Sequence, residues 1–267
     1  MVVFPNAKIN LGLFITSKRS DGFHNLESVF YPIPLNDALE IGINEGNGKI
    51  DFESYGLQIP GARRDNLIVK TIENFGTKEF DYEVNLIKKI PMGGGMGGGS
   101  SNAAFTLKLI NQLGALQKKV DLFDGAMSLG SDCGFFIKNV PSLVKGRGEE
   151  IEPISLNLKG FGLKLVLPAL HISTKLAFSK ITPKQRSISK DLFSVENIYD
   201  WKEHLENDFE KSVFAEFPAL KAIKAKLYES GAIYASMSGS GSTFFGIYPN
   251  SDIKKGVTNF KEIDLAL

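Results

Sequence analysis

The sequence predicts an α+β fold in two lobes. Segments with the two-residue alternation of strands and segments with helical periodicity follow each other without a strict βαβ rhythm. With 267 residues, of which 43% are hydrophobic, the chain can bury one large core or two modest ones. The character of the segments changes after about residue 155, so we expect lobes at 1–155 and 156–267.

The first half is expected to begin with strands and to add helices later. A turn at Asp21-Gly22 separates the first two strands, and a helix begins at Asp65 and ends at Gly76. A shorter helix ends near Gly130, and residues 134–154 are expected to be strands and turns. The other expected elements are strands at 8–16, 26–35, 38–43, 49–54 and 80–90 and a helix at 100–116.

The second half is expected to hold a buried strand at 162–170 and a polar loop at 182–200. Two helices follow at 201–214 and 217–230, the second ended by Gly231. Residues 232–248 then predict two strands joined by a loop of small residues.

Composition excludes several classes of function. A net charge of +1 gives no general attraction to nucleic acid or to an acidic membrane surface. The single cysteine, Cys133, rules out an internal disulfide framework and a zinc cluster, which fits a cytoplasmic protein. Lys8 interrupts the apolar start, so no secretory signal is predicted, and no stretch reaches the ~20 apolar residues of a membrane span.

The main chemical feature is a glycine loop at 91–101, in which six of the seven residues from Gly93 to Gly99 are glycine. Such a backbone can turn its N–H groups toward an anion, because no Cβ stands in the way. A strand precedes the loop and a helix follows it, and we expect Ser100 or Ser101 to cap that helix. The loop therefore predicts a phosphate cradle.

Other interpretations of the glycine loop fit less well. A Walker A loop needs a lysine directly after its last glycine, where this chain has Ser100. Gly93, Gly95 and Gly98 satisfy the Rossmann spacing, as any run this dense does by accident. A flexible linker would not run straight into an apolar helix.

A second small-residue loop, 236–243, lies between two apolar strands. It is either a surface hairpin or the partner of the first loop, with both lobes closing on one polyphosphate. Phosphoryl transfer to a hydroxyl also needs a base and a cation, and the candidates are Asp132 and Lys8, each flanked by apolar residues. The alternatives are a solvent-facing strand lysine and a turn or helix cap.

Segments 7–11, 91–101 and 238–241 resemble the three motifs of the GHMP small-molecule kinases. The resemblance runs from about residue 5 to residue 248 and implies an N-terminal lobe like ribosomal protein S5 and a ferredoxin-like C-terminal lobe. Segments 20–24, 65–67 and 130–133 are similar to the motifs of those GHMP kinases that act in the non-mevalonate isoprenoid pathway. The implied reaction is ATP-dependent phosphorylation of the 2-hydroxyl of a cytidine diphosphate ester of methylerythritol.

The resemblance also implies a role for individual residues. Asp132 is the base and Lys8 polarises the site. On the acceptor side, Asn10 contacts the methylerythritol, His24 bonds the cytosine edge, Phe23 and Phe178 stack on the ring, and Thr174 and Gly239 line the pocket. On the ATP side, the residues are Asn66, Lys88, Pro91, Gly93, Gly94, Gly95, Gly97, Gly98, Gly99, Ser100, Ser101 and Asn102.

Mg²⁺ is expected to arrive with the nucleotide, without a ligand cluster of the protein, and the chain to act as a monomer or homodimer. Phe23 and Gly134 replace the family's usual Tyr and Pro, and Gly134 is expected to make the enzyme slower or less thermostable. Open alternatives are a homoserine or mevalonate kinase, a regulator that binds nucleotide without turnover, and purely structural roles for Phe23, His24 and Phe178.

Overall fold

The computed structural model describes residues 1–250 and 253–267 and divides the chain into two compact units. Unit 1 comprises residues 1–7, 35–92 and 97–139, and unit 2 comprises 8–34, 93–96 and 140–267. Each unit is therefore assembled from segments that are distant in the sequence. The domain division expected after residue 155 stays a prediction.

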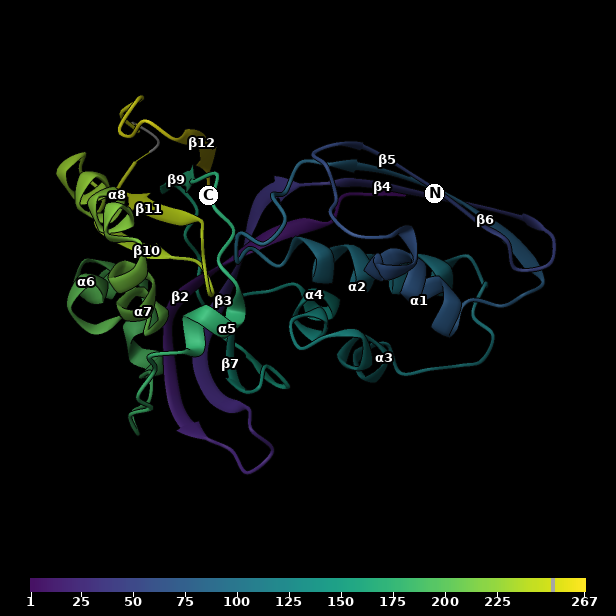
Figure 1. Cartoon of the computed structure of the whole chain (residues 1–267), viewed down its shortest axis with the longest axis horizontal. Helices are drawn as coiled ribbons and strands as arrows, with labels where there is room; N and C mark the ends of the chain where they lie inside the picture. Colours follow the sequence, from purple (N-terminus) through teal and green to yellow (C-terminus); the bar gives the residue numbers. More distant parts are fainter. Residues whose placement is uncertain (251–252) are drawn as a thin grey trace. The chain divides into compact units, whose positions relative to one another are not determined.

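Unit 1 is a four-stranded sheet with its helices packed against it (Figure 1). The strand order is β1-β4-β6-β5, with β4 antiparallel and β5 parallel to β6. Alternate residues of β4 and β6, such as Leu39, Ile41 and Val84, are buried in the core against the helices. The strands are β1 Val2–Val3, β4 Ala38–Glu45, β5 Ile50–Gly56 and β6 Phe80–Lys88.

The helices of unit 1 are α1 Leu67–Phe75, α2 Gly98–Gln112, α3 Leu122–Leu129 and α4 Cys133–Lys138, with a 3₁₀ turn at Arg63–Asp65. Asn66, not Asp65, is the N-cap of α1. The expectation of strands and turns from residue 134 was wrong for α4, because six residues are too few to show helical periodicity. Strands return only at β7.

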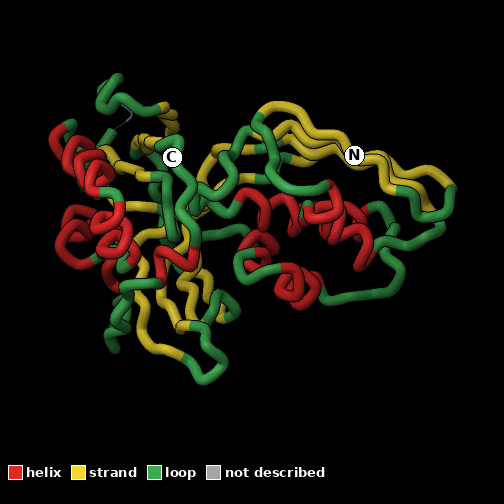
Figure 2. The backbone as a smooth tube through the Cα atoms, viewed as in Figure 1, coloured by secondary structure: helices red, strands yellow, loops and turns green. Residues whose placement is uncertain are grey.

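Unit 2 contains two sheets of four strands, ordered β2-β3-β7-β8 and β10-β11-β9-β12. Figure 2 shows the strands of the chain in yellow and the helices in red. The sequence predicted all of these strands except β12, which pairs antiparallel with β9. The bounds are β2 Asn6–Lys18, β3 His24–Asn36, β7 Ser142–Gly146, β8 Glu150–Pro153, β9 Gly162–Leu167, β10 Tyr234–Met237, β11 Phe244–Tyr248 and β12 Lys261–Ala266.

The helices of unit 2 are α5 Thr174–Phe178, α6 Trp201–His204, α7 Phe209–Glu216 and α8 Pro218–Glu229, with 3₁₀ segments at Lys190–Phe193 and Val195–Asp200. The single helix expected at 201–214 is two helices. Its middle is extended instead, because Glu206 O accepts from Leu13 N and Asp208 N donates to Leu13 O. Among the described residues, no helix has the length and apolar character needed to cross a membrane.

Candidate active site

The glycine loop and the second small-residue loop are hydrogen-bonded to each other within unit 2. Ser238 Oγ donates to Gly95 O over 2.9 Å, and Thr243 N donates to Gly94 O over 3.3 Å. A Cβ atom on Gly95 would lie 1.9 Å from Ser238 O, so only glycine fits there. The interpretation of 236–243 as a mere surface hairpin was wrong; shared binding of a polyphosphate stays a prediction.

Helix α2 begins with a glycine rather than a serine. Gly97 is the N-cap, with φ +69°, and makes no side-chain cap. The expected cap at Ser100 or Ser101 was wrong, because both serines lie inside the first helical turn. Ser101 N donates to Gly97 O over 2.8 Å, whereas the N–H groups that precede it in the helix lack intrahelical partners. Ser101 Oγ is buried and has no hydrogen-bond partner among the described residues. These donors at the positive end of α2 fit an anionic ligand.

A buried carboxylate, Asp37, fixes the segment that leads into the glycine loop. Its Oδ1 accepts from Lys89 N and Ile90 N at 2.7 and 2.9 Å. Its Oδ2 pairs with Lys88 Nζ and accepts from Asn102 Nδ2. Lys88 is 1% exposed, and burial lowers the pKa of its ammonium while Asp37 opposes the shift. The two predicted adenosine residues Lys88 and Asn102 thus meet at Asp37, and their contact with adenosine stays a prediction.

Unit 1 holds a cavity of about 330 Å³ beside the start of α2. Two of the predicted nucleotide residues, Asn66 and Asn102, line it together with Gly99 at the first turn of α2. Asn66 Oδ1 also accepts from Ile68 N over 2.9 Å, which fixes the side chain as the cap of α1. Apolar lining comes from Phe52, Ile59, Leu67 and Met92. Apolar walls with a few fixed polar groups are typical of small-molecule sites.

The predicted catalytic lysine is buried in unit 2. Lys8 is 3% exposed, and its Nζ donates to Asn10 Oδ1 over 2.6 Å and lies 4.4 Å from the centre of the Phe30 ring. The alternative of a solvent-facing lysine was therefore wrong. Asn10 in turn donates to Ser28 Oγ, and Lys8 N donates to Met96 O in the glycine loop. The strand that carries Lys8 and Asn10 is thus bonded to the glycine loop.

Asp132 lies in unit 1 at the N-cap position of α4. Its carboxylate makes no capping hydrogen bond to that helix, so the helix-cap alternative does not account for the side chain. The next residue, Cys133, is fully buried, and burial raises the pKa of its thiol to about 12, opposed by a hydrogen bond with Ser100. The contact of Ser100 and Cys133 links α4 to the first turn of α2.

Of the residues predicted to bind the cytosine ring, His24 and Phe178 are in contact, while Phe23 contacts Arg147 instead. The rings of His24 and Phe178 stack with their centres 4.9 Å apart. Thr174 and Phe178 are the first and last residues of α5, four positions apart and so on one side of the helix. Phe23 is 53% exposed and stacks against the Arg147 guanidinium, 3.8 Å from the ring centre. His24 does more than cap a turn, but binding of a base stays a prediction.

The sequence interpretation missed two residues that the geometry makes prominent. Asp37 stands between two predicted strands, and a carboxylate in that position was an available signal for a buried partner. Asn207 interrupts the predicted helix 201–214, and its side chain bonds the backbone of the second loop at Met237 and Gly239. The only sequence signal for this role was the polar pair Asn207-Asp208, which interrupts the helical pattern of apolar residues.

Two family models match the chain: the GHMP kinases N terminal domain over residues 66–146 and the GHMP kinases C terminal domain over residues 190–262. A crystal structure of 4-(cytidine 5'-diphospho)-2C-methyl-D-erythritol kinase superposes with a TM-score of 0.86 at 27% identity, covering 99% of this chain and 98% of that one. A homoserine kinase from Cytophaga hutchinsonii shares the fold, with a TM-score of 0.73 at 18% identity and 98% and 92% coverage.

These matches define the class as a GHMP kinase, with the α+β fold that the sequence predicted. Proteins named 4-diphosphocytidyl-2-C-methyl-D-erythritol kinase are similar over almost the whole chain. The one from Bacteroides thetaiotaomicron is 46% identical over 98% of this chain and 99% of its own length. That from Bacteroides fragilis is 48% identical over 96% and 95%. The chain belongs to the 4-diphosphocytidyl-2-C-methyl-D-erythritol kinase family.

Proposed function

We propose that the chain transfers the γ-phosphoryl group of ATP to the 2-hydroxyl of 4-diphosphocytidyl-2-C-methyl-D-erythritol. The observation that carries the proposal is the buried Lys8–Asn10 pair, whose strand is bonded to the glycine loop through Met96 O. A buried ammonium beside a side-chain amide and a phosphate cradle suits an alcohol substrate next to a triphosphate. Membership of the kinase family makes ATP the donor.

In the proposed mechanism, the N–H groups at the start of α2 and in the glycine loop hold the phosphates, and Asn66 and Asn102 face the nucleoside. Asp132 accepts the proton of the attacking hydroxyl. Lys8 orients the hydroxyl, and its positive charge stabilises the charge that develops during transfer. Mg²⁺ is proposed to bind with the phosphates. No group of three or more acidic, histidine or cysteine ligands occurs among the described residues, and Mg²⁺ on nucleotides keeps several water and phosphate ligands.

On the acceptor side, we assign the cytosine to His24, Phe178 and Phe23, and the erythritol part to Asn10 and Gly239. Stacking on phenyl rings accepts any base, so the hydrogen bond of His24 has to supply the preference for cytosine. Gly239 is buried at φ +55°, and Asn10 Oδ1 lies 3.5 Å from the position of a Cβ there, which supports a shared role. The single cysteine, free and buried, supports a cytoplasmic enzyme. We further propose that the enzyme acts as a monomer or homodimer.

The test measures ADP release from Mg-ATP with the cytidyl substrate, homoserine and mevalonate in parallel. We expect turnover with the cytidyl substrate alone. Asp132→Asn should lower kcat by about 10²–10⁴-fold, the usual contribution of a general base. Asp124→Asn, an exposed carboxylate on α3, is the matched control and should keep wild-type kcat. Turnover of homoserine instead would keep the fold and refute the assignment of the acceptor site.

A further inference from the structure

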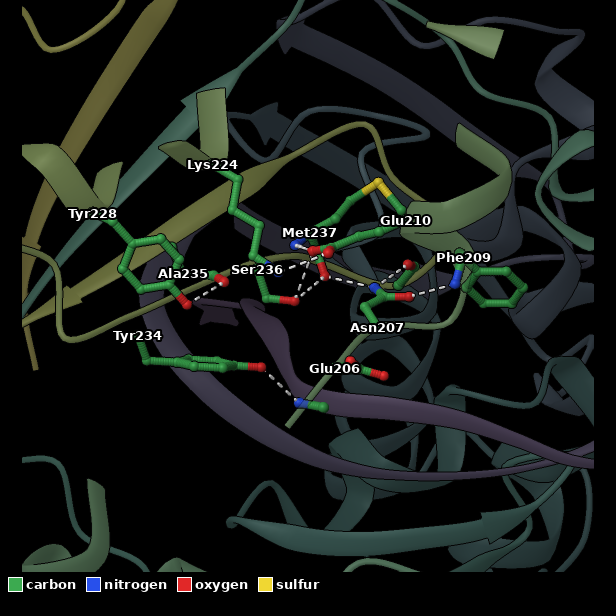
Figure 3. A network of polar contacts seen from close by, with 12 residues as sticks. Glu206, Asn207, Phe209, Glu210, Lys224, Tyr228, Tyr234, Ala235, Ser236 and Met237 are labelled. Carbon is green, nitrogen blue, oxygen red and sulfur yellow. Dashed lines mark hydrogen bonds and ion pairs between the residues drawn. The ribbon is translucent and has the colours of Figure 1, made fainter. Parts of the chain in front are cut away.

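A polar network in unit 2 ties the segment between α6 and α7 to the second small-residue loop (Figure 3). Asn207 is its centre and is 3% exposed. Its Nδ2 donates to Met237 O over 2.7 Å and to Gly239 O over 2.8 Å. The two acceptors flank Ser238, so a single amide fixes the start of the loop on both sides.

The same segment is bonded to the strand that carries the proposed active residues. Leu13 N donates to Glu206 O over 2.8 Å, Asp208 N to Leu13 O over 2.9 Å, and Ile15 N to Asp208 Oδ2 over 2.7 Å. These bonds hold both neighbours of Asn207 along β2, a few residues beyond Asn10. The segment 206–208 is therefore hydrogen-bonded to both β2 and the second loop, and Asn207 is its middle residue.

Glu210 completes the attachment from the first turn of α7. Its Oε1 accepts from Met237 N over 2.9 Å and from Ser236 Oγ over 3.1 Å, and its Oε2 pairs with Lys224 over 2.7 Å (Figure 3). Glu210 thus holds the end of β10 by hydrogen bonds to Ser236 and Met237. Asn207 bonds the loop that follows. The loop then contacts the cradle through Ser238 Oγ and Gly95 O.

We propose that Asn207 is a positioning residue for phosphoryl transfer, which sets loop 238–241 against Asn10 and the glycine loop. The inference rests on the proposed kinase function. The side-chain hydrogen bonds of Asn207 go to the loop and to the start of α7, so it acts on the reaction through the loop that it holds. Misplacement of reacting groups by about 1 Å can cost 10²-fold in rate, so the loss of two bonds to the loop should be visible in kcat.

A purely local role for Asn207 has to be separated from this one. Asn207 Oδ1 accepts from Phe209 N over 2.9 Å, an Asx turn that starts α7. Asn207→Ser keeps a hydroxyl for that turn, because serine makes the same motif, but loses the pair of N–H donors to the loop. Asn207→Asp has the side-chain volume of asparagine and also lacks both donors.

The experiment compares wild type, Asn207→Ser and Ser230→Ala in steady-state kinetics, thermal melting and hydrogen exchange. Ser230 ends α8 and bonds Tyr248 at the far end of β11 from the loop, so it is the matched control. For Asn207→Ser we expect kcat to fall about 10²-fold with less than a threefold change in the KM of ATP. Amides of residues 238–243 should exchange faster, and those of 244–248 at the wild-type rate. Ser230→Ala should keep kcat.

Two outcomes overturn the proposal: a kcat loss no larger than that of Ser230→Ala, or unchanged exchange of 238–243. Should Asn207→Ser not accumulate as folded protein, Asn207→Asp tests the same two donors with the same readouts. If wild type turns over none of the acceptors, the proposed function fails. The exchange of 238–243 then still decides whether Asn207 holds the loop.

Discussion

Gly134 illustrates how one residue can be governed by a neighbour that the sequence does not reveal. It is the second residue of α4, and a Cβ at this position would lie 2.5 Å from Met127 Sδ and 3.0 Å from the Phe123 ring. The sequence led us to expect a slower or less thermostable enzyme with glycine at this position, and for stability these contacts predict the opposite. Glycine here makes room for the side chains of α3 against α4.

We predict that Gly134→Ala lowers the free energy of unfolding by about 1–3 kcal/mol, the usual range for overpacking. Gly134→Pro should also destabilise, although proline suits a first helical turn, because its ring fills the same space. The measurement is urea unfolding of both variants in wild-type and Met127→Ala backgrounds. Removing the methionine should cancel most of the loss. A loss of the same size in both backgrounds would refute the packing argument.

His24 gives a prediction about pH. Burial lowers the pKa of its imidazole below 6.5, and the charge of Lys18 lowers it further. The neutral ring is favoured in the folded state, so its contribution to stability is present above pH 6.5 and is lost as the pH falls through the lowered pKa.

A neutral His24 offers one donor and one acceptor to a base, while the charged form offers only donors. We predict that the KM for the cytidyl substrate is constant from pH 7 to 8 and rises as the pH falls below 6.5. Steady-state kinetics on wild type and His24→Asn measure it, and the variant should lack the rise. A rise of the same size in His24→Asn would assign it to another group.

At the scale of elements, Asp37 joins three parts of unit 1. It lies between β3 and β4, bonds the backbone just after β6, and receives a hydrogen bond from Asn102 in α2. A Cβ on Gly98 would lie 2.9 Å from Lys88 Nζ, so the start of α2 is packed directly on the buried ammonium. The end of the glycine loop is therefore packed on this ion pair.

We predict that Asp37→Asn lowers the free energy of unfolding by about 3–5 kcal/mol, because the Lys88 charge loses its buried partner. Asp37→Asn with Lys88→Met should recover most of the loss, because the unpaired charge is gone. Asp81→Asn is the control, since Asp81 also accepts backbone N–H groups but is only partly buried. Denaturant unfolding of the four proteins measures the effect. Equal losses in the single and double variants would contradict the role of charge.

At the scale of the whole molecule, the proposed ligands map to different units. The cavity lined by Asn66 and Asn102 belongs to unit 1, and the stacked pair of His24 and Phe178 belongs to unit 2. The glycine loop contributes residues 93–96 to unit 2 and residues 91–92 and 97–101 to unit 1.

We therefore predict that ADP slows hydrogen exchange at residues 59–67 and 97–102, and that the cytidyl substrate slows it at 22–24 and 174–178. Bound ligand reduces local opening of the segments that it contacts. Helix α8 lies in neither set and should be unaffected by ADP. Protection of 174–178 by ADP without protection of 59–67 would exchange the two assignments.

The sequence was informative wherever a local pattern was long enough. Alternating apolar residues predicted β2 through β6, and Gly76 and Gly231 marked the ends of α1 and α8. The pattern failed where an element was short or where distant backbone competed. Helix α4 has six residues, and the expected helix 201–214 is broken by bonds to Leu13, far away in the chain.

By itself the sequence determined the strands other than β1 and β12 and the position of the glycine loop, because periodicity and missing side chains are properties of neighbouring residues. It also placed Lys8 and Asp132 among apolar residues and so implied partners for both. Only the tertiary structure decided that Asp37 bonds the backbone just before the glycine loop and that Asn207 bonds the second loop. Those hydrogen bonds join Asp37 to Ile90 and Asn207 to Gly239, 53 and 32 residues apart. No local pattern specifies which residues a folded chain brings together at such separations.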